Sequence, residues 1–307
     1  MKFPSPSSAE AVVSVAGLAR RFGSKWVLND VSLYVPRGSV FGLVGENGAG
    51  KTTLIKHLLG LLGAEAGTVR VFGQDPVREP VSVLSRVGYL SEEPDLPSWM
   101  RVSELLRYTQ GFYSTWDPVY AETLRAQFGL DPNQRLKTLS KGQRAKAALL
   151  IAQAHRPELL VLDEPSSGLD PLVRREILEA VIGTVAQEGR TVFFSSHLLE
   201  EIERVSDHVG MLHQGKLVLC GPLDELKQQY RRVTLHFAEA LERPPAIPGA
   251  LRVTGRGKEW TVLCNGGGKT LAANALILGA TIVDDRHPSL DELFVAHAAP
   301  EAGVFSK

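Results

Sequence analysis

The chain has 307 residues, of which 44% are hydrophobic and 22% are charged, as is ordinary for a soluble globular protein. Lys and Arg together number 34 and Asp and Glu also number 34, so bulk charge favours neither nucleic acid nor an anionic membrane as a partner. No apolar run approaches the ~20 residues of a membrane-spanning helix, and the length allows one large domain or two modest ones.

The N-terminal part predicts a short tail followed by strands. Residues 1–9 lack the apolar core of a signal peptide, and we expect a flexible tail there. Residues 12–15 and 31–35 have the composition of half-buried strands, and residues 40–44 are uniformly apolar, as in a buried parallel strand.

A glycine-rich loop follows this buried strand and precedes a helix-compatible stretch at residues 54–59. It reads Gly45-Glu46-Asn47-Gly48-Ala49-Gly50-Lys51-Thr52-Thr53. Such a loop turns backbone N–H groups toward a polyphosphate at a helix N-terminus. We expect Lys51 to reach the β- and γ-phosphates of a nucleotide and Thr52 to offer its hydroxyl to Mg²⁺. A chance glycine-rich turn is the alternative, which the flanking strand and helix disfavour.

The middle of the chain predicts a nucleotide-binding α/β core that is interrupted by a helical segment, at about residues 94–157. Buried-strand composition returns at residues 159–162 and 191–194, with a helical stretch at 171–187 between them. Further short strands are expected at residues 68–72 and 87–90.

Two adjacent carboxylates, Asp163 and Glu164, come directly after the buried strand at residues 159–162. Ligands of open α/β sheets bind at the carboxyl ends of the strands. We therefore expect Asp163 to hold Mg²⁺ and Glu164 to orient or deprotonate a water that attacks the γ-phosphorus. Taken alone, the pair could simply cap a strand end.

A helix is expected to start at Ser140-Lys141-Gly142-Gln143. Ser140 and Gln143 fit a capping box, which needs no ligand. Alternatively, the helix N-terminus and the Ser140 hydroxyl face an anion. Lys141 favours the second interpretation, because a cation there costs ~0.3–1 kcal/mol against the helix dipole unless a phosphate lies nearby.

The pattern changes after Gly221-Pro222 and predicts a small α+β domain at residues 224–307. It has strand-like runs at 233–237 and 260–264, a helix at 271–278 and a final acidic helix. Residues 265–270 mimic a phosphate loop, but we expect a strand-to-helix turn there. The two cysteines, Cys220 and Cys264, lie in apolar runs and are expected to be reduced, buried thiols.

These motifs together resemble ABC-type ATPases over about residues 10–223. Residues 139–143 resemble the signature motif, 45–53 Walker A, 159–164 Walker B and 167–170 the D-loop. The resemblance implies a P-loop NTPase fold with an antiparallel β subdomain and a helical insertion. It also implies that Phe22 stacks on adenine, that His197 contacts the γ-phosphate, and that Ser140, Gly142, Gln143 and Asp170 help to bind ATP.

The chain departs from the family pattern at two positions. Lys141 stands where the signature usually has Gly, and Glu92 stands where the family usually has a Gln that touches Mg²⁺. A carboxylate is also a good Mg²⁺ ligand, so Glu92 stays a candidate metal site.

The resemblance also implies partners. In this family the signature of one subunit closes over ATP held by another, so we expect a homodimer or a pair with a related ATPase subunit. Residues 99–105, 111–117 and 288–294 look like the ATP-binding subunits of bacterial ABC-2-type exporters. We therefore expect a cytoplasmic protein, peripheral on the inner face of the membrane through a permease that selects the cargo.

Two other classes of protein are alternatives to this prediction. A soluble ABC ATPase acting on ribosomes or nucleic acid usually has two cassettes or a long coiled coil, and neither is visible in the sequence; no nucleic acid partner is expected. A regulatory module without turnover would lack Lys51, Glu164 or His197, and all three are present.

Overall fold

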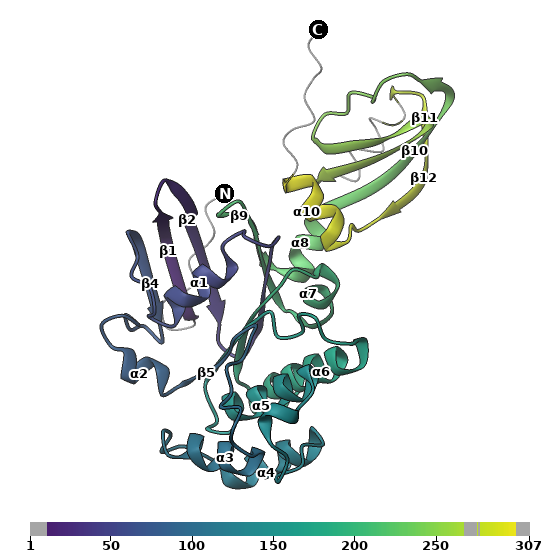
Figure 1. Ribbon diagram of the computed structural model, residues 1–307. Coiled ribbons are helices and arrows are strands. Elements are labelled where there is room, and N and C mark those ends of the chain that lie inside the picture. Colours follow the sequence, from purple (N-terminus) through teal and green to yellow (C-terminus); the bar gives the residue numbers. More distant parts are fainter. Residues whose placement is uncertain (1–10, 267–274, 276, 299–307) are drawn as a thin grey trace. The chain divides into compact units, whose positions relative to one another are not determined.

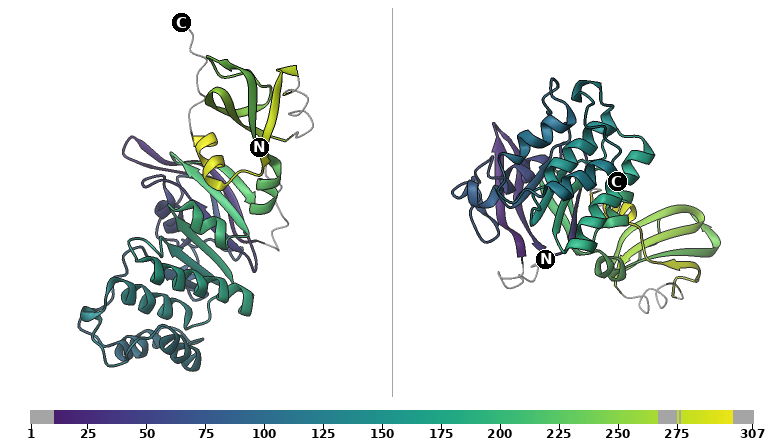
Figure 2. Two further views of the ribbon diagram at one scale, coloured as in Figure 1. Left: turned by 90° about the vertical axis from the view of Figure 1, so that its right-hand side faces the viewer. Right: turned by 90° about the horizontal axis from the view of Figure 1, so that it is seen from below.

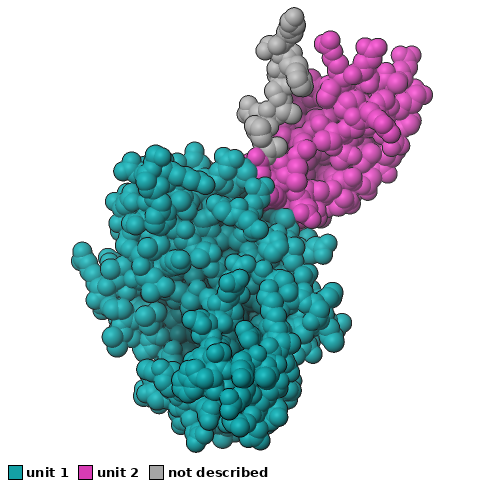
Figure 3. All heavy atoms as spheres, viewed as in Figure 1, with its two compact units in different colours: residues 1–220 teal, residues 221–307 magenta. Residues whose placement is uncertain are grey.

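The computed structural model describes residues 11–266, 275 and 277–298 (Figure 1). It divides into two compact units, Met1–Cys220 and Gly221–Lys307 (Figure 3), close to the predicted domain boundary. The predicted tail at residues 1–9, the glycine-rich run beyond residue 266 and most of the predicted helix at 271–278 lie outside the described residues.

The first unit is built on a six-stranded sheet of order β5-β6-β7-β3-β8-β9. The pairs β5/β6, β6/β7, β7/β3 and β3/β8 are parallel, and every residue of β3, β6 and β7 is buried, as the buried-strand composition of residues 40–44, 159–162 and 191–194 predicts. Their carboxyl ends therefore meet at one edge of the sheet. The strands are β3 (Val40–Val44), β5 (Val87–Leu90), β6 (Leu159–Asp163), β7 (Thr191–Ser196), β8 (His208–His213) and β9 (Lys216–Pro222).

A second, antiparallel sheet of the same unit has the order β2-β1-β4. Its strands are β1 (Ala11–Phe22), β2 (Lys25–Pro36) and β4 (Ala66–Val71). The first two run farther than predicted, because they continue as a hairpin that pairs Phe22 with Lys25. The residues at this end of the hairpin are mostly exposed, so the sequence has no apolar pattern there that would predict a strand.

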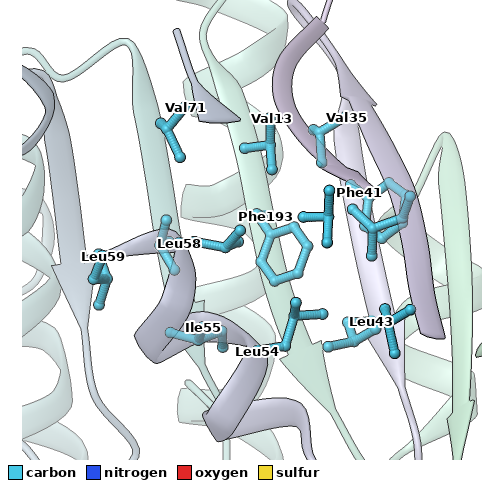
Figure 4. Packing of buried hydrophobic residues seen from close by; sticks show 14 of the residues in the cluster. Val13, Val35, Phe41, Leu43, Leu54, Ile55, Leu58, Leu59, Val71 and Phe193 are labelled. Atoms are coloured by element: carbon cyan, nitrogen blue, oxygen red, sulfur yellow. The ribbon is translucent and has the colours of Figure 1, made fainter. Parts of the chain in front are cut away.

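Helix α1 (Lys51–Leu58) lies in the core that both sheets share (Figure 4). Its Leu54, Ile55 and Leu58 are fully buried with Phe193 of the parallel sheet and Val13 of the antiparallel sheet. Each such side chain stabilises the fold by about 1.5–3 kcal/mol. The start of α1, which carries the glycine-rich loop, is thus fixed between two sheets.

The predicted helical segment is confirmed, and its helices gather at one end of this unit (Figures 1 and 2). Trp99 and Met100, which precede these helices, have opposite environments: Trp99 is 69% exposed and Met100 is 5% exposed. The helices of the segment are α3 (Val102–Gln110), α4 (Pro118–Gln127), η1 (Leu136–Thr138) and α5 (Lys141–Gln153).

Three further helices complete the first unit: α2 (Pro80–Leu84), α6 (Pro171–Glu188) and α7 (Leu199–Val205). Of these, α6 covers the helical stretch that was predicted between the two buried strands. Among the described residues, no helix is both long and apolar enough to cross a membrane.

The second unit has a three-stranded antiparallel sheet of order β11-β10-β12, with its own apolar core around Trp260 and Val262. Cys264 is buried there, as Cys220 is in the first unit, and both thiols are free. Within its described residues the elements are α8 (Leu223–Gln229), β10 (Tyr230–Leu241), β11 (Ala250–Asn265), β12 (Ala280–Arg286) and α10 (Leu290–Ala298).

Candidate active site

The glycine-rich loop has a shape that only glycine allows at its key positions. A Cβ at Gly45 would lie 2.4 Å from the Leu212 carbonyl oxygen, and one at Gly50 would lie 2.7 Å from that of Val27. Gly48 and Gly50 also have positive φ angles of 79° and 111°. Gly50 is the N-cap of α1, so the loop ends where the helix N–H groups begin. This backbone fits a polyphosphate, which helix N-termini bind well.

Lys51 is the first residue of α1 and its side chain is only 6% exposed. Its ammonium donates to the carbonyl oxygens of Gly45, at 2.5 Å, and Glu46, at 3.2 Å. It also forms an ion pair of 3.1 Å with Oε1 of Glu164. The cation is thus held over the loop, beside the carboxylate that follows β6.

Glu164 brings Lys51 and His197 together. Its other oxygen, Oε2, lies 2.7 Å from Nδ1 of His197 and accepts the His197 backbone N–H at 3.3 Å. The carboxylate is 5% exposed, and the Glu164 backbone adopts φ 49°, a left-handed conformation that is costly for a residue with a side chain. Three residues predicted from separate motifs therefore meet at the carboxyl ends of β3, β6 and β7, with Lys51 and Glu164 buried and His197 37% exposed.

Asp163 is 2% exposed and is oriented by Ser195. The Ser195 hydroxyl donates to Asp163 Oδ1 at 2.7 Å and accepts the Glu164 backbone N–H at 3.0 Å. Burial, followed by the nearby charge of Asp163, raises the pKa of Tyr89 on β5. Ser195 was not among the predicted site residues, although a polar residue near the end of an otherwise apolar strand was a usable signal.

A second buried carboxylate, Glu201, was also missed. Its oxygens accept hydrogen bonds of 2.7 Å from the hydroxyls of Ser166 and Ser196, and Arg174 lies 3.4 Å away. Ser166 follows Glu164 closely and Ser196 precedes His197. Glu201 thus ties together the two segments that present the central pair.

The signature residues form a capping box at the start of α5, because Ser140 and Gln143 exchange hydrogen bonds of 3.0 and 3.2 Å. Gly142 is buried against Val173 of α6. Among the described residues, no hydrogen bond or ion pair links these signature residues to Lys51 or Glu164.

The other predicted site residues lie around the loop or near the Asp163–Glu164 turn. Thr52, Asn47 and Gly48 are exposed, Thr53 is half-buried and Ala49 is buried. Phe22 is 47% exposed, and the guanidinium of Arg20 lies over its ring. Asp170 caps α6 by accepting the N–H groups of Leu172 and Val173. Glu92 accepts a hydrogen bond from the Ser167 hydroxyl.

Comparison with known proteins identifies the family. Residues 28–167 match the family model described as ABC transporter. The bacitracin transport ATP-binding protein BcrA of Enterococcus faecalis is 35% identical over 227 residues, which cover 73% of this chain and 74% of that protein. The ABC transporter ATP-binding protein NatA of Bacillus subtilis is 34% identical, over 74% of this chain and 96% of its own length.

The chain belongs to the ATP-binding subunits of ABC transporters. A solved structure of an ATP-binding subunit of an ABC transporter is 31% identical, with a TM-score of 0.65, and covers 71% of this chain and 92% of that one. As a member of the family, the chain binds ATP and hydrolyses it to drive transport. The predicted ABC ATP-binding cassette, with its antiparallel subdomain and its C-terminal α+β extension, is confirmed.

Proposed function

We propose that this chain is the ATP-hydrolysing subunit of an ABC-2-type exporter, with Lys51, Glu164 and His197 as its catalytic residues. The contacts of Glu164 with Lys51 and with His197 carry the proposal. When ATP binds, the Lys51 ammonium leaves its ion pair with the Glu164 carboxylate and donates to the β- and γ-phosphate oxygens instead. Glu164, then free of its ion pair, accepts a proton from the attacking water, and His197 keeps that carboxylate oriented.

The donor set beside this constellation suits Mg²⁺, which takes hard oxygen ligands and keeps several waters. Asp163 is buried next to Glu164, and Thr52 and Glu92 add a hydroxyl and a second carboxylate. The ion would neutralise charge on the phosphates during hydrolysis. These residues are our proposed metal site.

The remaining ATP-binding residues support a dimer. The loop residues from Gly45 to Thr53 and Phe22 would bind ATP in one protomer. Ser140, Gly142, Gln143 and Asp170 make their contacts away from Lys51, so we assign them to the ATP of a second copy or a related subunit. ATP that binds the closed pair preferentially would stabilise it by mass action.

Exposed aromatic side chains on the helical segment support docking to a membrane permease. Trp99 is 69% exposed, and Tyr108 and Phe112 are 53% and 66% exposed with their rings 5.1 Å apart. Clustered exposed aromatics are typical of interaction surfaces. We place the chain on the inner face of the membrane through this permease, which selects the cargo, and assign it no nucleic acid partner.

The first test uses Glu164→Gln in the full chain. We expect hydrolysis to fall by ~10²–10⁴-fold, the usual contribution of a general base, with ATP binding retained. Purification of the tagged variant from detergent-solubilised native membranes with ATP should recover a polytopic membrane protein. Unchanged hydrolysis would remove Glu164 from its role, and recovery of ribosomal or nucleic acid components instead would overturn the export assignment.

The permease surface is tested in the same pull-down. Trp99→Ala should lose the membrane protein while hydrolysis by the isolated chain stays normal. Trp26→Ala is the matched control, because Trp26 is also exposed, at 48%, but lies on β2. Equal recovery from both variants would contradict the assignment of this surface.

A further inference from the structure

Two oppositely charged side chains contact neighbouring residues of the loop that follows Glu164, here called loop 166–170. Glu92, which comes after β5, accepts the Ser167 hydroxyl hydrogen on Oε1 at 3.1 Å. Lys141, the first residue of α5, lies against Gly168: a Cβ on Gly168 would be 2.4 Å from the Lys141 Nζ and 3.6 Å from its Cε. These are also the two positions at which the chain departs from the family pattern.

A lysine at position 141 lowers the stability of α5, and its contact with Gly168 gives a reason for its presence there. A cation in the first turn of a helix interacts unfavourably with the helix dipole. The helix start is already capped by Ser140 and Gln143, so Lys141 is not needed as a cap. The end of its side chain instead occupies the space next to Gly168 that a Cβ would take, which is free because glycine has no side chain.

Loop 166–170 is connected to the reacting centre through its backbone. The Ser167 N–H donates to the Glu164 carbonyl oxygen at 3.0 Å, and the Leu169 N–H donates to that of Ser166 at 3.2 Å. Glu164 itself has the left-handed backbone noted above, which persists only where its surroundings hold it. A shift of the loop is therefore transmitted to the Glu164 backbone, from which the carboxylate reaches Lys51 and His197.

We propose that Glu92 and Lys141 are a pair of positioning residues that hold loop 166–170 from two sides and thereby set the orientation of Glu164. Glu92 acts through the Ser167 hydroxyl and Lys141 acts through packing on Gly168. The link to hydrolysis rests on the proposed role of Glu164, whereas the effect on the loop does not. Because both residues hold one loop, their effects should be coupled rather than additive.

The Lys141–Gly168 contact is tested by a double-mutant cycle on stability. Gly168→Ala should lower the urea midpoint mainly from backbone strain at φ 63°, with a smaller part because the flexible end of Lys141 must move away from the new Cβ. In a Lys141→Ala background only the strain remains, so the decrease should be smaller. Equal decreases in both backgrounds would show that Lys141 does not pack on Gly168 and would overturn the proposal.

The loop itself is tested by hydrogen exchange of the nucleotide-free full chain. Glu92→Ala and Lys141→Ala should each speed exchange of the Ser167 and Leu169 amides. In the double variant the free-energy change of exchange should be smaller than the sum of the changes in the two single variants. Glu92→Gln keeps an acceptor oxygen and should retain wild-type protection. Glu93→Ala and Lys137→Ala, exposed neighbours of the same charges, are the controls. Unchanged exchange in both single variants would overturn the proposal.

Kinetics then test the link to Glu164. Each single variant should lower kcat by about tenfold, less than the ~10²-fold that a displacement of ~1 Å can cost. An unchanged KM for ATP is expected of Lys141→Ala only, because Glu92 also belongs to the proposed metal site. Faster exchange with normal kcat, in a protein that Glu164→Gln still inactivates, would overturn the link. Activity of Glu164→Gln itself would instead overturn the proposed function and leave the exchange result intact.

Discussion

At the scale of single residues, the site depends on one buried charge pair. Lys51 and Glu164 are 6% and 5% exposed and 3.1 Å apart. Burying one charge without its partner is far more costly than burying the pair, because the remaining charge loses both water and its counter-ion. The pair should therefore contribute to folding as well as to chemistry.

We expect Lys51→Ala to lower the free energy of unfolding by about 3–5 kcal/mol, since it leaves the buried Glu164 carboxylate without its counter-ion, with only the His197 contacts on Oε2 remaining. The double variant Lys51→Ala/Glu164→Gln removes both charges and should recover much of this loss. Urea unfolding of the nucleotide-free proteins measures the effect. Equal losses in the single and double variants would mean that the ion pair is not coupled in the folded chain.

The sequence was enough to single out these residues as candidates but not to identify the residues that contact them. Gly45, Lys51, Glu164 and His197 stand in short local patterns, so each could be found without knowing the fold. Ser195 and Glu201 act through residues ~30 or more positions away, and such contacts depend on the strand order. The contact of Lys141 with Gly168 was equally invisible, because the helix dipole suggested only that an anion lies nearby.

At the scale of elements, close backbone approach decides where helices pack on the sheet. Gly88 of β5 faces α5 so closely that a Cβ there would lie 2.0 Å from the Ala152 carbonyl oxygen. Gly183, in the interior of α6, has no atom within 4 Å of an added Cβ. The two glycines should therefore respond in opposite ways to the same substitution.

We expect Gly88→Ala to destabilise the protein by about 1–3 kcal/mol through overpacking. Gly183→Ala should instead stabilise it by about 0.5–1 kcal/mol, because alanine favours a helix interior. Thermal or urea unfolding of both variants gives the comparison. A stabilising Gly88→Ala would show that β5 and α5 are not packed so closely.

His155, which follows α5, joins that helix to β5 and predicts a pH effect. It stacks on Tyr113 with ring centroids 3.8 Å apart, and its Nε2 lies 3.2 Å from the Val87 carbonyl oxygen. Burial lowers the pKa of His155 to about 4. Between pH 6.5 and 4, His155 therefore binds a proton more readily in the unfolded chain than in the folded one. The stability that is present above pH 6.5 is lost as the pH falls through this window.

Protonation of His155 alone should therefore make the free energy of unfolding about 2 kcal/mol lower at pH 5 than at pH 8. His155→Phe keeps a ring against Tyr113 but cannot titrate, so its stability should fall less steeply with decreasing pH. Urea midpoints at both pH values test this. Parallel pH profiles for the two proteins would contradict the burial of a neutral His155.

Element boundaries were predictable where burial was uniform. The strand expected at residues 191–194 is β7, which continues through two buried serines to Ser196 because all six of its residues are buried. In contrast, β12 was missed: it is an edge strand with only one buried residue, Ala280, so it shows neither an apolar run nor alternation. The short helix α8 was missed because only Leu223 and Leu226 are buried in it.

At the scale of the whole molecule, every proposed ATP-site residue belongs to the first unit. The parallel sheet of that unit ends with β9 at Pro222, and the second unit has a separate apolar core. A unit with its own core is expected to fold independently of its neighbour in the chain. The ATP site should then survive removal of the second unit.

We expect a chain that ends at Pro222 to bind a fluorescent ATP analogue with the affinity of the full chain. A chain that ends at His213 lacks β9, whose Leu219 and Cys220 are buried, and should not fold. Loss of binding in the longer truncation, with its circular dichroism intact, would place part of the site in residues 223–307.

The pairing of β6 with β7 places Asp163 opposite Ser195, and this alignment determines how the chain tolerates changes in length. Side chains alternate between the faces of a strand, so one extra residue inside β7 would turn the Ser195 hydroxyl away from both Asp163 and Glu164. Extra residues in the turn between α6 and β7, around Gly189, would leave the alignment unchanged. Insertions and deletions in this family of sequences should therefore accumulate before Thr191 and be absent from Thr191 to His197.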